Sequence, residues 1–310
     1  ELVREALASG VSPWRIAFVS FTKKAVAEAL GRACAAFNLQ PKQLPYFRTL
    51  HSLGFHGLGM TRDAMMSGPD WKLLGHSLGV AFDGMEAVSP DDGVLIPSVG
   101  GNGLRYIQML DRARYRMVPV EQEFREANDY DLSFAKLRQT AQALDTYKST
   151  YSKIDFVDLI DKYPDIAEIP SLDLLIVDEA QDLTPLQWRM IDAIAAKAKR
   201  CVFAGDDDQA IHAWTGVDVS LFLDSADARS VLSQSYRLPR AVFDVSQKLV
   251  KRIRHREPKD FRPTEREGSV TYHMSLDTIP FHEGSWTVMA RTNGFVNMFR
   301  EWFEEAGYLY

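Results

Sequence analysis

Cysteine is scarce in this chain of 310 residues, where only Cys34 and Cys201 occur. Two isolated cysteines supply neither a disulfide framework nor the ligand spacing of a metal site, so a reducing compartment is the default. A long apolar run and a signal peptide are also missing. Their absence argues against a membrane partner and predicts a cytoplasmic protein.

Basic charge is not in excess either, because the formal net charge is −6. A protein coated in basic surface is therefore excluded, and any contact with nucleic acid has to be local, through a groove. The length allows about two domains. The apolar content is ordinary for a soluble globular protein.

The most informative stretch is residues 174–182, where four apolar residues precede a cluster of acids. The apolar run predicts a strand buried on both faces, as in a parallel sheet covered by helices. Asp178 and Glu179 follow where the strand would end, which is where ligands bind in open α/β sheets. One carboxylate there suits an Mg²⁺ that bridges nucleotide phosphates, and a second suits a general base for water. The competing interpretation is a strand followed by a polar turn.

Strand and helix patterns alternate on both sides of this stretch, which predicts an α/β fold. Thr22 is the expected N-cap of a helix that runs to about Phe37. The first helix has no visible beginning, so a preceding segment is expected. Further strands are predicted at 15–20, 200–204, 230–232 and 285–291. Residues 47–54 are predicted to form a strand edge that leads into a loop. Helices are predicted at 1–8, 104–116, 133–152, from 184, from 239 to about 254, and at 296–306.

Seven short motifs follow one another along the chain, at residues 21–25, 49–52, 155–159, 178–182, 205–214, 235–239 and 289–293. In residue content and order they resemble motifs Ia and Ib, the segment before motif II, and motifs II, III, IV and IVa of the UvrD/Rep/PcrA family of superfamily 1 DNA helicases. The resemblance covers nearly the whole chain apart from an insertion. It implies a RecA-like P-loop NTPase domain with a parallel sheet (residues 1–59 and 153–220), a helical insertion (60–152) and the start of a second RecA-like domain (221–310).

The resemblance also implies roles at an ATP site. Asp178 would hold Mg²⁺, and Glu179 would polarise the attacking water. Gln209 would sense the γ-phosphate, and Arg237 would reach it from the second domain and stabilise the developing charge. Tyr236 would stack on the adenine. Simpler readings are an aromatic residue in the core for Tyr236 and a surface ion pair for Arg237.

A second set of matching residues implies contacts with single-stranded DNA. Trp214 would stack on a base, a contact worth about 1–3 kcal/mol. Phe21 and His51 would line the path of the strand, and Thr22 and His212 belong to the same motifs. Trp214 could instead be a core aromatic.

The sequence departs from the family pattern in three respects. No G-x-x-x-x-G-K-[ST] loop, the Walker A phosphate cradle, occurs in it. Motifs V and VI are not found. Lys23, His212 and Thr215 stand where the family usually has Asn, Tyr and Arg. The chain is therefore expected to be the middle of a helicase that is inactive by itself.

The function that the resemblance implies is an ATP-dependent DNA helicase or translocase of 3′→5′ polarity, with ATP and Mg²⁺ as cofactors. Its partners would be single-stranded DNA and single-strand/duplex junctions. One alternative is a metal-dependent nuclease, in which the acids at 178, 179 and 182 and at 206–208 hold two metal ions. Another is a DNA-binding scaffold that does not hydrolyse ATP.

Overall fold

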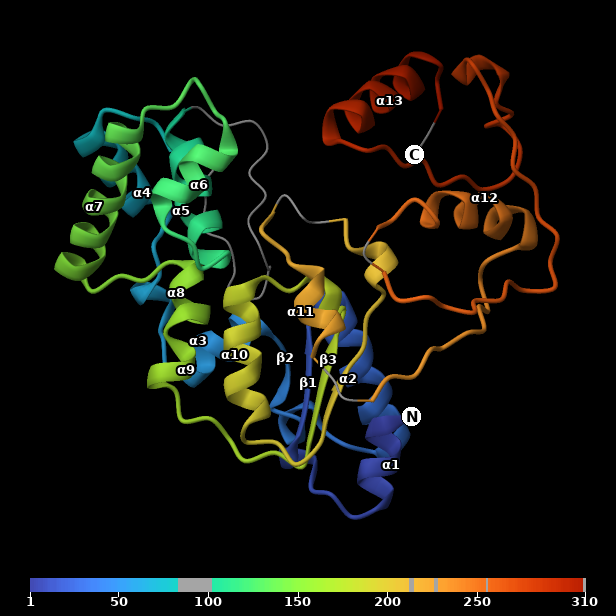
Figure 1. The fold of residues 1–310 in the computed structure, drawn as a ribbon, viewed down its shortest axis with the longest axis horizontal. Coiled ribbons are helices and arrows are strands. Elements are labelled where there is room, and N and C mark those ends of the chain that lie inside the picture. The colour runs from blue at the N-terminus through green and yellow to red at the C-terminus, as the bar shows by residue number, and fades with distance from the viewer. Residues whose placement is uncertain (83–101, 212–214, 226–227, 255, 309–310) are drawn as a thin grey trace. The chain divides into compact units, whose positions relative to one another are not determined.

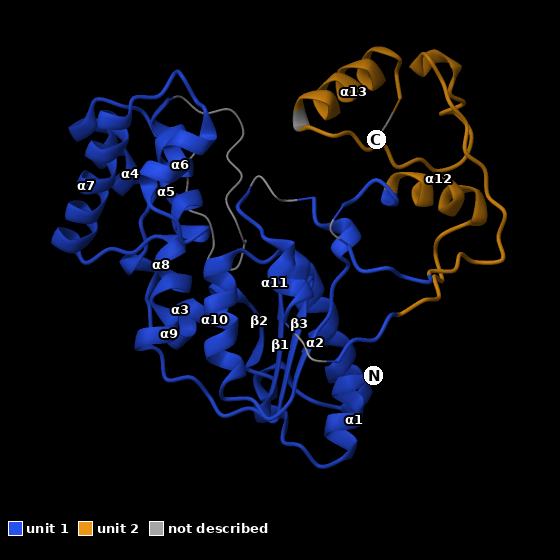
Figure 2. Cartoon of the chain, in the orientation of Figure 1, with its two compact units in different colours: residues 1–231, 250–260 blue, residues 232–249, 261–310 orange. Residues whose placement is uncertain are grey.

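The computed structural model describes residues 1–82, 102–211, 215–225, 228–254 and 256–308. Two compact units make up the chain (Figure 2). Unit 1 comprises Glu1–Val231 and Val250–Asp260, and unit 2 comprises Leu232–Leu249 and Phe261–Tyr310. No described helix has the length and the apolarity that crossing a bilayer requires.

A parallel sheet of four strands forms the centre of the described part of unit 1 (Figure 1). The strands lie in the order β2-β1-β3-β4, and each neighbouring pair runs parallel. The strand expected from the apolar run is β3, and its first four residues are buried. The expected α/β class with a covered parallel sheet of the RecA-like kind is confirmed. The strands are β1 (Ile16–Ser20), β2 (Tyr46–Thr49), β3 (Leu174–Asp178) and β4 (Cys201–Phe203).

Helices cover both faces of this sheet because successive strand residues point to opposite sides. Ile16, Leu174 and Ile176 pack on one face with residues of α1 and α2. Ala17, Leu175 and their neighbours pack on the other face with residues of α3, α8 and α10. Double coverage explains why β3 is apolar without alternation. The covering helices are α1 (Leu2–Ala8), α2 (Lys23–Phe37), α3 (Leu50–Gly57), α8 (Phe156–Asp161) and α10 (Pro185–Ala195).

Threonine caps begin the helices that follow three of the strands. Thr22 caps α2 as predicted, since its hydroxyl oxygen accepts a hydrogen bond from the Ala25 amide at 3.2 Å. Thr49 caps α3 in the same way through the Ser52 amide, also at 3.2 Å. The loop expected after β2 was therefore a wrong prediction, because the chain enters a helix directly. Thr184 caps α10, with Pro185 in its first turn.

Residues 60–152 contain helices with a core of their own. Trp71, Leu104, Ile107 and Leu137 are buried within it, and further side chains from all four helices surround them. The helices predicted at 104–116 and 133–152 are confirmed as α5 and α7, whereas α4 and α6 were not predicted. The four are α4 (Gly68–Leu78), α5 (Asn102–Tyr115), α6 (Val120–Ala127) and α7 (Phe134–Tyr151).

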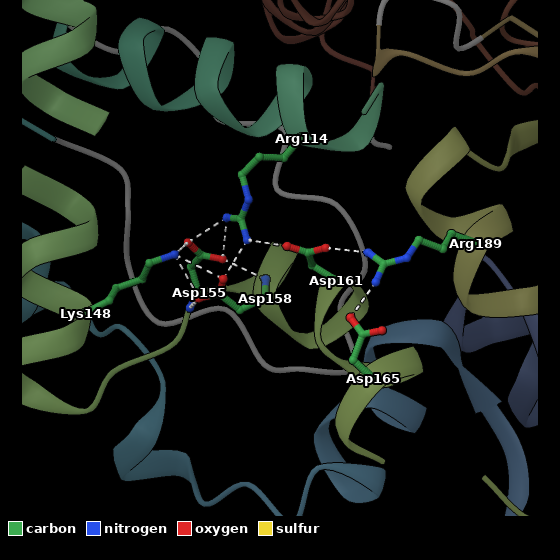
Figure 3. A network of polar contacts seen from close by, with 7 residues as sticks. All are labelled: Arg114, Lys148, Asp155, Asp158, Asp161, Asp165 and Arg189. Atoms are coloured by element: carbon green, nitrogen blue, oxygen red, sulfur yellow. Dashed lines mark hydrogen bonds and ion pairs between the residues drawn. The ribbon is translucent and has the colours of Figure 1, made fainter. Parts of the chain in front are cut away.

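A buried network of charges joins these helices to α8 of the sheet layers (Figure 3). Arg114 of α5 donates to both carboxylate oxygens of Asp155 at 3.0 Å and to Asp158 at 2.6 Å. Lys148 of α7 approaches the same two carboxylates at 2.7 and 2.9 Å. Burial opposes the charge of Asp155, but Arg114 and Lys148 outweigh it and lower the pKa of Asp155 to about 2. The network therefore fixes α5 and α7 to α8 with compensated charges.

The network continues along the surface of the same unit. Asp161 of α8 accepts from Arg189 of α10 at 2.9 Å, and Arg189 also donates to Asp165 at 2.5 Å (Figure 3). Asp165 lies on α9 (Tyr163–Ile166). These outer pairs are more exposed than the inner ones and therefore contribute less to stability.

The segments at 230–232 and 285–291, for which strands are predicted, are irregular in the structure and contain neither strand nor helix. The two strand predictions are therefore wrong. A strand needs a neighbour to complete its hydrogen bonds, and the bridge between Gln234 and Arg262 is the one pairing in the described residues of unit 2. The helices after residue 216 are α11 (Val219–Leu223) in unit 1, α12 (Arg240–Val250) and α13 (Asn293–Glu305).

Candidate nucleotide site at the carboxyl edge of the sheet

The strand registers place the segments that follow β1, β2, β3 and β4 at one edge of the sheet. Ser20, the last residue of β1, pairs with Asp178 of β3 on one side and with Thr49 of β2 on the other. Val177 pairs with Phe203, so the loop after β4 starts beside Asp178. Ser20 is only 2% exposed, and its hydroxyl has no hydrogen-bond partner among the described groups. A buried orphan hydroxyl next to a carboxylate is the kind of polar group that a ligand at this edge would satisfy.

Asp178 and Glu179 lie at this edge, and among the described residues no cation pairs with them. Burial raises the pKa of the half-buried Asp178, the charge of Glu179 raises it further, and a backbone hydrogen bond from Glu179 opposes this shift. No ion pair from a described residue reaches either carboxylate. Glu179 is exposed and has a left-handed backbone with φ of 56°, a conformation that is uncommon for a residue other than glycine. Oxygen ligands of this kind fit Mg²⁺, which would relieve the repulsion between the two acids.

Gln181 connects the turn after β3 with the turn after β4, a role that sequence reasoning missed. Its side chain is buried, with the residue 1% exposed. The amide nitrogen donates to Glu179 at 2.8 Å and to Asp182 at 3.2 Å, while the amide oxygen accepts from the Asp206 backbone at 3.0 Å. A side-chain Cβ at Gly205 would collide with that amide oxygen. The available signal was a single amide among the three acids of residues 178–182, because an amide can donate and accept where a carboxylate only accepts.

Gln209 ends a short 3₁₀ turn, Asp207–Gln209, that follows β4. Asp206 caps this turn by accepting from the Asp208 amide at 3.2 Å. The Gln209 side chain is exposed, and its amide nitrogen donates to the same Asp206 carboxylate at 2.6 Å. Gln209 is therefore tethered through Asp206, which Gln181 holds beside Glu179.

The residues expected to contact DNA are placed in different surroundings. Phe21 is half-buried and Thr22 is exposed, both directly after β1 at the edge that carries Asp178. His51 is 3% exposed, and a ring nitrogen lies 3.2 Å from the Tyr115 hydroxyl. Burial lowers the pKa of His51 to about 4, so this imidazole is neutral at neutral pH. His212 and Trp214 lie outside the described residues.

Tyr236 and Arg237 belong to unit 2. The Tyr236 side chain is 86% exposed, so the simpler reading of a core aromatic does not apply to it. Arg237 is also exposed, and its backbone amide is hydrogen-bonded to the Ser235 hydroxyl at 3.2 Å. Its carbonyl oxygen accepts from Arg266 at 2.7 Å. The backbone around the two side chains is thus ordered by local contacts, and no ion pair of Arg237 with a described residue is found.

A cavity of about 630 Å³ lies beside the segment that follows Trp214, between residues 216–218 and helices α5 and α6. Arg112 and Arg116 line it. Both arginines pair with Glu123, a carboxylate without exposed surface, and Arg116 also pairs with Glu126 at 2.6 Å. Their charges are therefore compensated within the protein, and the cavity is not counted as an anion site.

The acids of the proposed two-metal nuclease are arranged differently from what that alternative needs. The carboxylates of residues 206–208 pair with Arg256 and Lys259. In the part of the chain that the structure describes, no group of three or more His, Cys, Asp or Glu side chains is arranged to hold a metal ion. The nuclease alternative is therefore not favoured.

Comparison with known proteins agrees with the motifs. A family model described as UvrD/REP helicase N-terminal domain matches residues 1–229. Among curated proteins, ATP-dependent DNA helicase PcrA of Staphylococcus epidermidis is 24% identical over 268 residues, which are 80% of this chain and 35% of that protein. PcrA of Leuconostoc citreum is 24% identical over 279 residues, covering 85% and 36%. PcrA of Staphylococcus aureus is 22% identical over 287 residues, covering 86% and 38%. The chain thus spans a little over a third of the length of these relatives.

Proposed function

Because the chain belongs to the UvrD/REP helicase family, we propose that its full-length protein is an ATP-dependent DNA helicase or translocase. It would move 3′→5′ along single-stranded DNA and separate strands at single-strand/duplex junctions. The observation that carries the proposal is the pair Asp178 and Glu179 at the carboxyl edge of a parallel sheet, where no described residue forms an ion pair with either acid. Similar proteins named ATP-dependent DNA helicases support the choice of reaction.

The donor set at this edge fits the metal part of the cofactor. Asp178 would hold Mg²⁺ through a carboxylate oxygen, and the orphan hydroxyl of Ser20 offers a further polar contact. When bound, Mg²⁺ would neutralise charge on the phosphates of ATP. The 310 residues contain no Walker A loop, so they do not provide the phosphate cradle. The chain by itself is accordingly expected to turn over ATP negligibly.

The other residues would act on the water and on the phosphate. Glu179 would accept a proton from the attacking water, for which its exposed carboxylate is free of ion pairs with described residues. Gln209 would contact the γ-phosphate and report its presence to the DNA-binding segments. Arg237 would stabilise charge on the transferring group, and Tyr236 would stack on the adenine.

The strand of DNA would run past the residues that follow β1. Phe21 and Thr22 would contact it there, and Trp214 and His212 would contact it from the segment after Gln209. His51 is buried, so in this proposal it would support the path by holding α3 against Tyr115 of α5. Contacts of this kind do not depend on base sequence, which suits a translocase.

Substitution of Glu179 by Gln in the full-length protein tests the proposal, because the amide keeps the size of the side chain but cannot take the proton. ATP turnover with single-stranded DNA should fall about 10²–10⁴-fold, while binding of ATP, measured with a fluorescent analogue, persists. Glu168→Gln is the matched control, since Glu168 is an exposed glutamate two residues after the end of α9. The control should leave turnover unchanged.

Two outcomes would contradict the proposal. The first is a Glu179→Gln protein that unwinds duplex at the rate of the unsubstituted protein. The second is an unsubstituted protein that binds single-stranded DNA without hydrolysing ATP, which would favour the scaffold alternative. Duplexes with either a 3′ or a 5′ single-stranded tail test the polarity, and unwinding confined to the 5′-tailed substrate would refute 3′→5′ movement.

A further inference from the structure

The loop that carries Gln209 is bound by a stretch of unit 1 that lies far away in sequence. Residues 256–259 form this stretch, which we call the clamp. Arg256 contacts Asp208 across 48 residues of chain. The contact is bidentate, with Nε 2.7 Å from Oδ1 and Nη2 2.8 Å from Oδ2. A planar guanidinium that meets a carboxylate in this way fixes direction as well as distance.

The rest of the clamp engages the two other acids of the loop. The Lys259 ammonium lies 2.9 Å from Asp206 and 2.9 Å from Asp208, and it also pairs with Asp207. The backbone amide of Glu257 donates to Asp207 at 2.7 Å. Three adjacent carboxylates repel one another when they are unpartnered. The clamp therefore gives this loop the conformation in which all three acids have a donor.

The clamp reaches Gln209 through Asp206. One oxygen of the Asp206 carboxylate accepts from Lys259 and caps the turn, while the other accepts from the Gln209 side chain at 2.6 Å. The clamp side chains are largely covered, with 20% of Arg256 and 16% of Lys259 exposed. Such contacts are more ordered than an exposed ion pair, whose two side chains remain free to move. The orientation of Gln209 thus depends on cations 47 or more positions away.

The clamp is also where unit 1 is covalently joined to unit 2 on both sides. Residues 250–260 belong to unit 1, whereas the flanking stretches 232–249 and 261–310 belong to unit 2 (Figure 2). Six residues separate the clamp from Leu249 and one residue separates it from Phe261, so the clamp is connected to unit 2 through short stretches of chain.

We propose that Arg256 and Lys259 are positioning residues, which hold Gln209 in the orientation needed at the γ-phosphate and tie that orientation to unit 2. This inference rests on the proposed function, because it assumes that Gln209 contacts the phosphate. The competing explanation is that the clamp only neutralises three acids. The two explanations differ in whether a cation of another shape can replace Arg256.

Steady-state ATP hydrolysis by the full-length protein at saturating single-stranded DNA separates them. Arg256→Gln should lower kcat about 10- to 100-fold, the usual consequence of a small misplacement, with little change in KM for ATP. Arg256→Lys keeps the charge but loses the bidentate geometry, so it should restore only part of kcat. Arg252→Gln, which removes an exposed arginine of the preceding turn, is the control and should match the unsubstituted protein. Full rescue by Arg256→Lys, or a normal kcat in Arg256→Gln, would overturn the proposal.

Hydrogen–deuterium exchange of the nucleotide-free protein tests the clamp independently of activity. Arg256→Gln and Lys259→Gln should speed exchange of the amides at 206–209 and leave those of β3 unchanged. Unchanged exchange at 206–209 would refute the clamp even if hydrolysis fell. If the unsubstituted protein shows no DNA-stimulated hydrolysis, the proposed function is wrong and the role of the clamp at the phosphate falls with it. Exchange then still decides whether the clamp orders the loop.

Discussion

Replacement of Arg114 by Met tests how much the buried charge network contributes to stability. Met is of similar length and apolar, so the change removes the guanidinium and leaves most of the packing. Asp155 and Asp158, 5% and 4% exposed, would then have Lys148 as their sole cation among the described residues. Breaking a buried pair from one side costs about 3–5 kcal/mol because a charge is stranded.

The shifted pKa of Asp155 gives a second figure of the same order. A decrease from 3.8 to about 2 corresponds to a stabilisation of about 2 kcal/mol, of which Lys148 supplies a part. We therefore expect Arg114→Met to lower the free energy of unfolding by about 2–4 kcal/mol at pH 7. Because the pKa is depressed in the folded state, this stabilisation is present above pH 3.8 and is lost as the pH falls toward 2.

Urea unfolding of the two proteins at a series of pH values is the assay. The difference in unfolding free energy should be nearly constant between pH 6 and 5 and should shrink below about pH 4; pH 7 is left out of this comparison because Arg114 also lowers the pKa of Asp111, which is about 7. Arg32→Met is the control, since Arg32 forms an exposed pair with Glu28 on α2, and it should cost no more than about 0.5 kcal/mol. A loss in Arg114→Met no greater than in this control, or one that does not change with pH, would refute the reasoning.

Four further substitutions test the fold. Burial and the neighbouring Asp155 raise the pKa of Asp111 to about 7, so its ionisation destabilises the folded state as the pH rises. The melting temperature of Asp111→Asn should therefore increase relative to that of the unsubstituted protein as the pH rises from 4 to 7. A difference in melting temperature that stays constant over this range would contradict this. Gly54→Ala should cost about 1–3 kcal/mol in urea because its Cβ would strike the Leu159 carbonyl oxygen, whereas Gly31→Ala on α2 has open space and should stabilise by about 0.5–1 kcal/mol. Leu175→Ala, which empties a fully buried site in β3, should cost about 2–5 kcal/mol, and a smaller loss would show that the layers collapse around the gap.

The sheet and its acidic edge could be predicted because the signals are local. Four apolar residues followed by Asp178 identify β3, and a threonine before a helical pattern identifies the cap of α2 at Thr22. The helix α3 could not be predicted in this way, since its sequence holds two glycines in eight residues. Gly54 lies in α3 because it permits close contact with α8, and such a tertiary reason outweighs weak helix propensity. The strands at 230–232 and 285–291 were wrongly predicted for the opposite reason. Their local sequence is typical of a strand, but neither segment has a pairing partner among the described residues.

The same distinction between local and distant signals applies to the side chains around the candidate site. Asp178, Glu179 and Gln209 could be named because their motifs are contiguous in the chain. The burial of His51 could not, because it depends on Tyr115, 64 residues away. The pairing of Asp208 with Arg256 likewise spans 48 residues, and the charged stretch around Arg256 had the composition of a linker. Sequence spacing alone does not distinguish a solvated charge from one that meets a distant partner.

The interruption of unit 1 has a consequence for the order of events during synthesis on the ribosome. Asp208 emerges 48 residues before the arginine that binds it, and the first stretch of unit 2 emerges in between. At about 5–20 residues per second, this delay lasts about 2–10 s. Throughout it the three carboxylates after β4 have no cation from residues 256–259. The loop that bears Gln209 therefore acquires its final form only after Leu232–Leu249 has been made, so that part of the first unit matures after the second has begun.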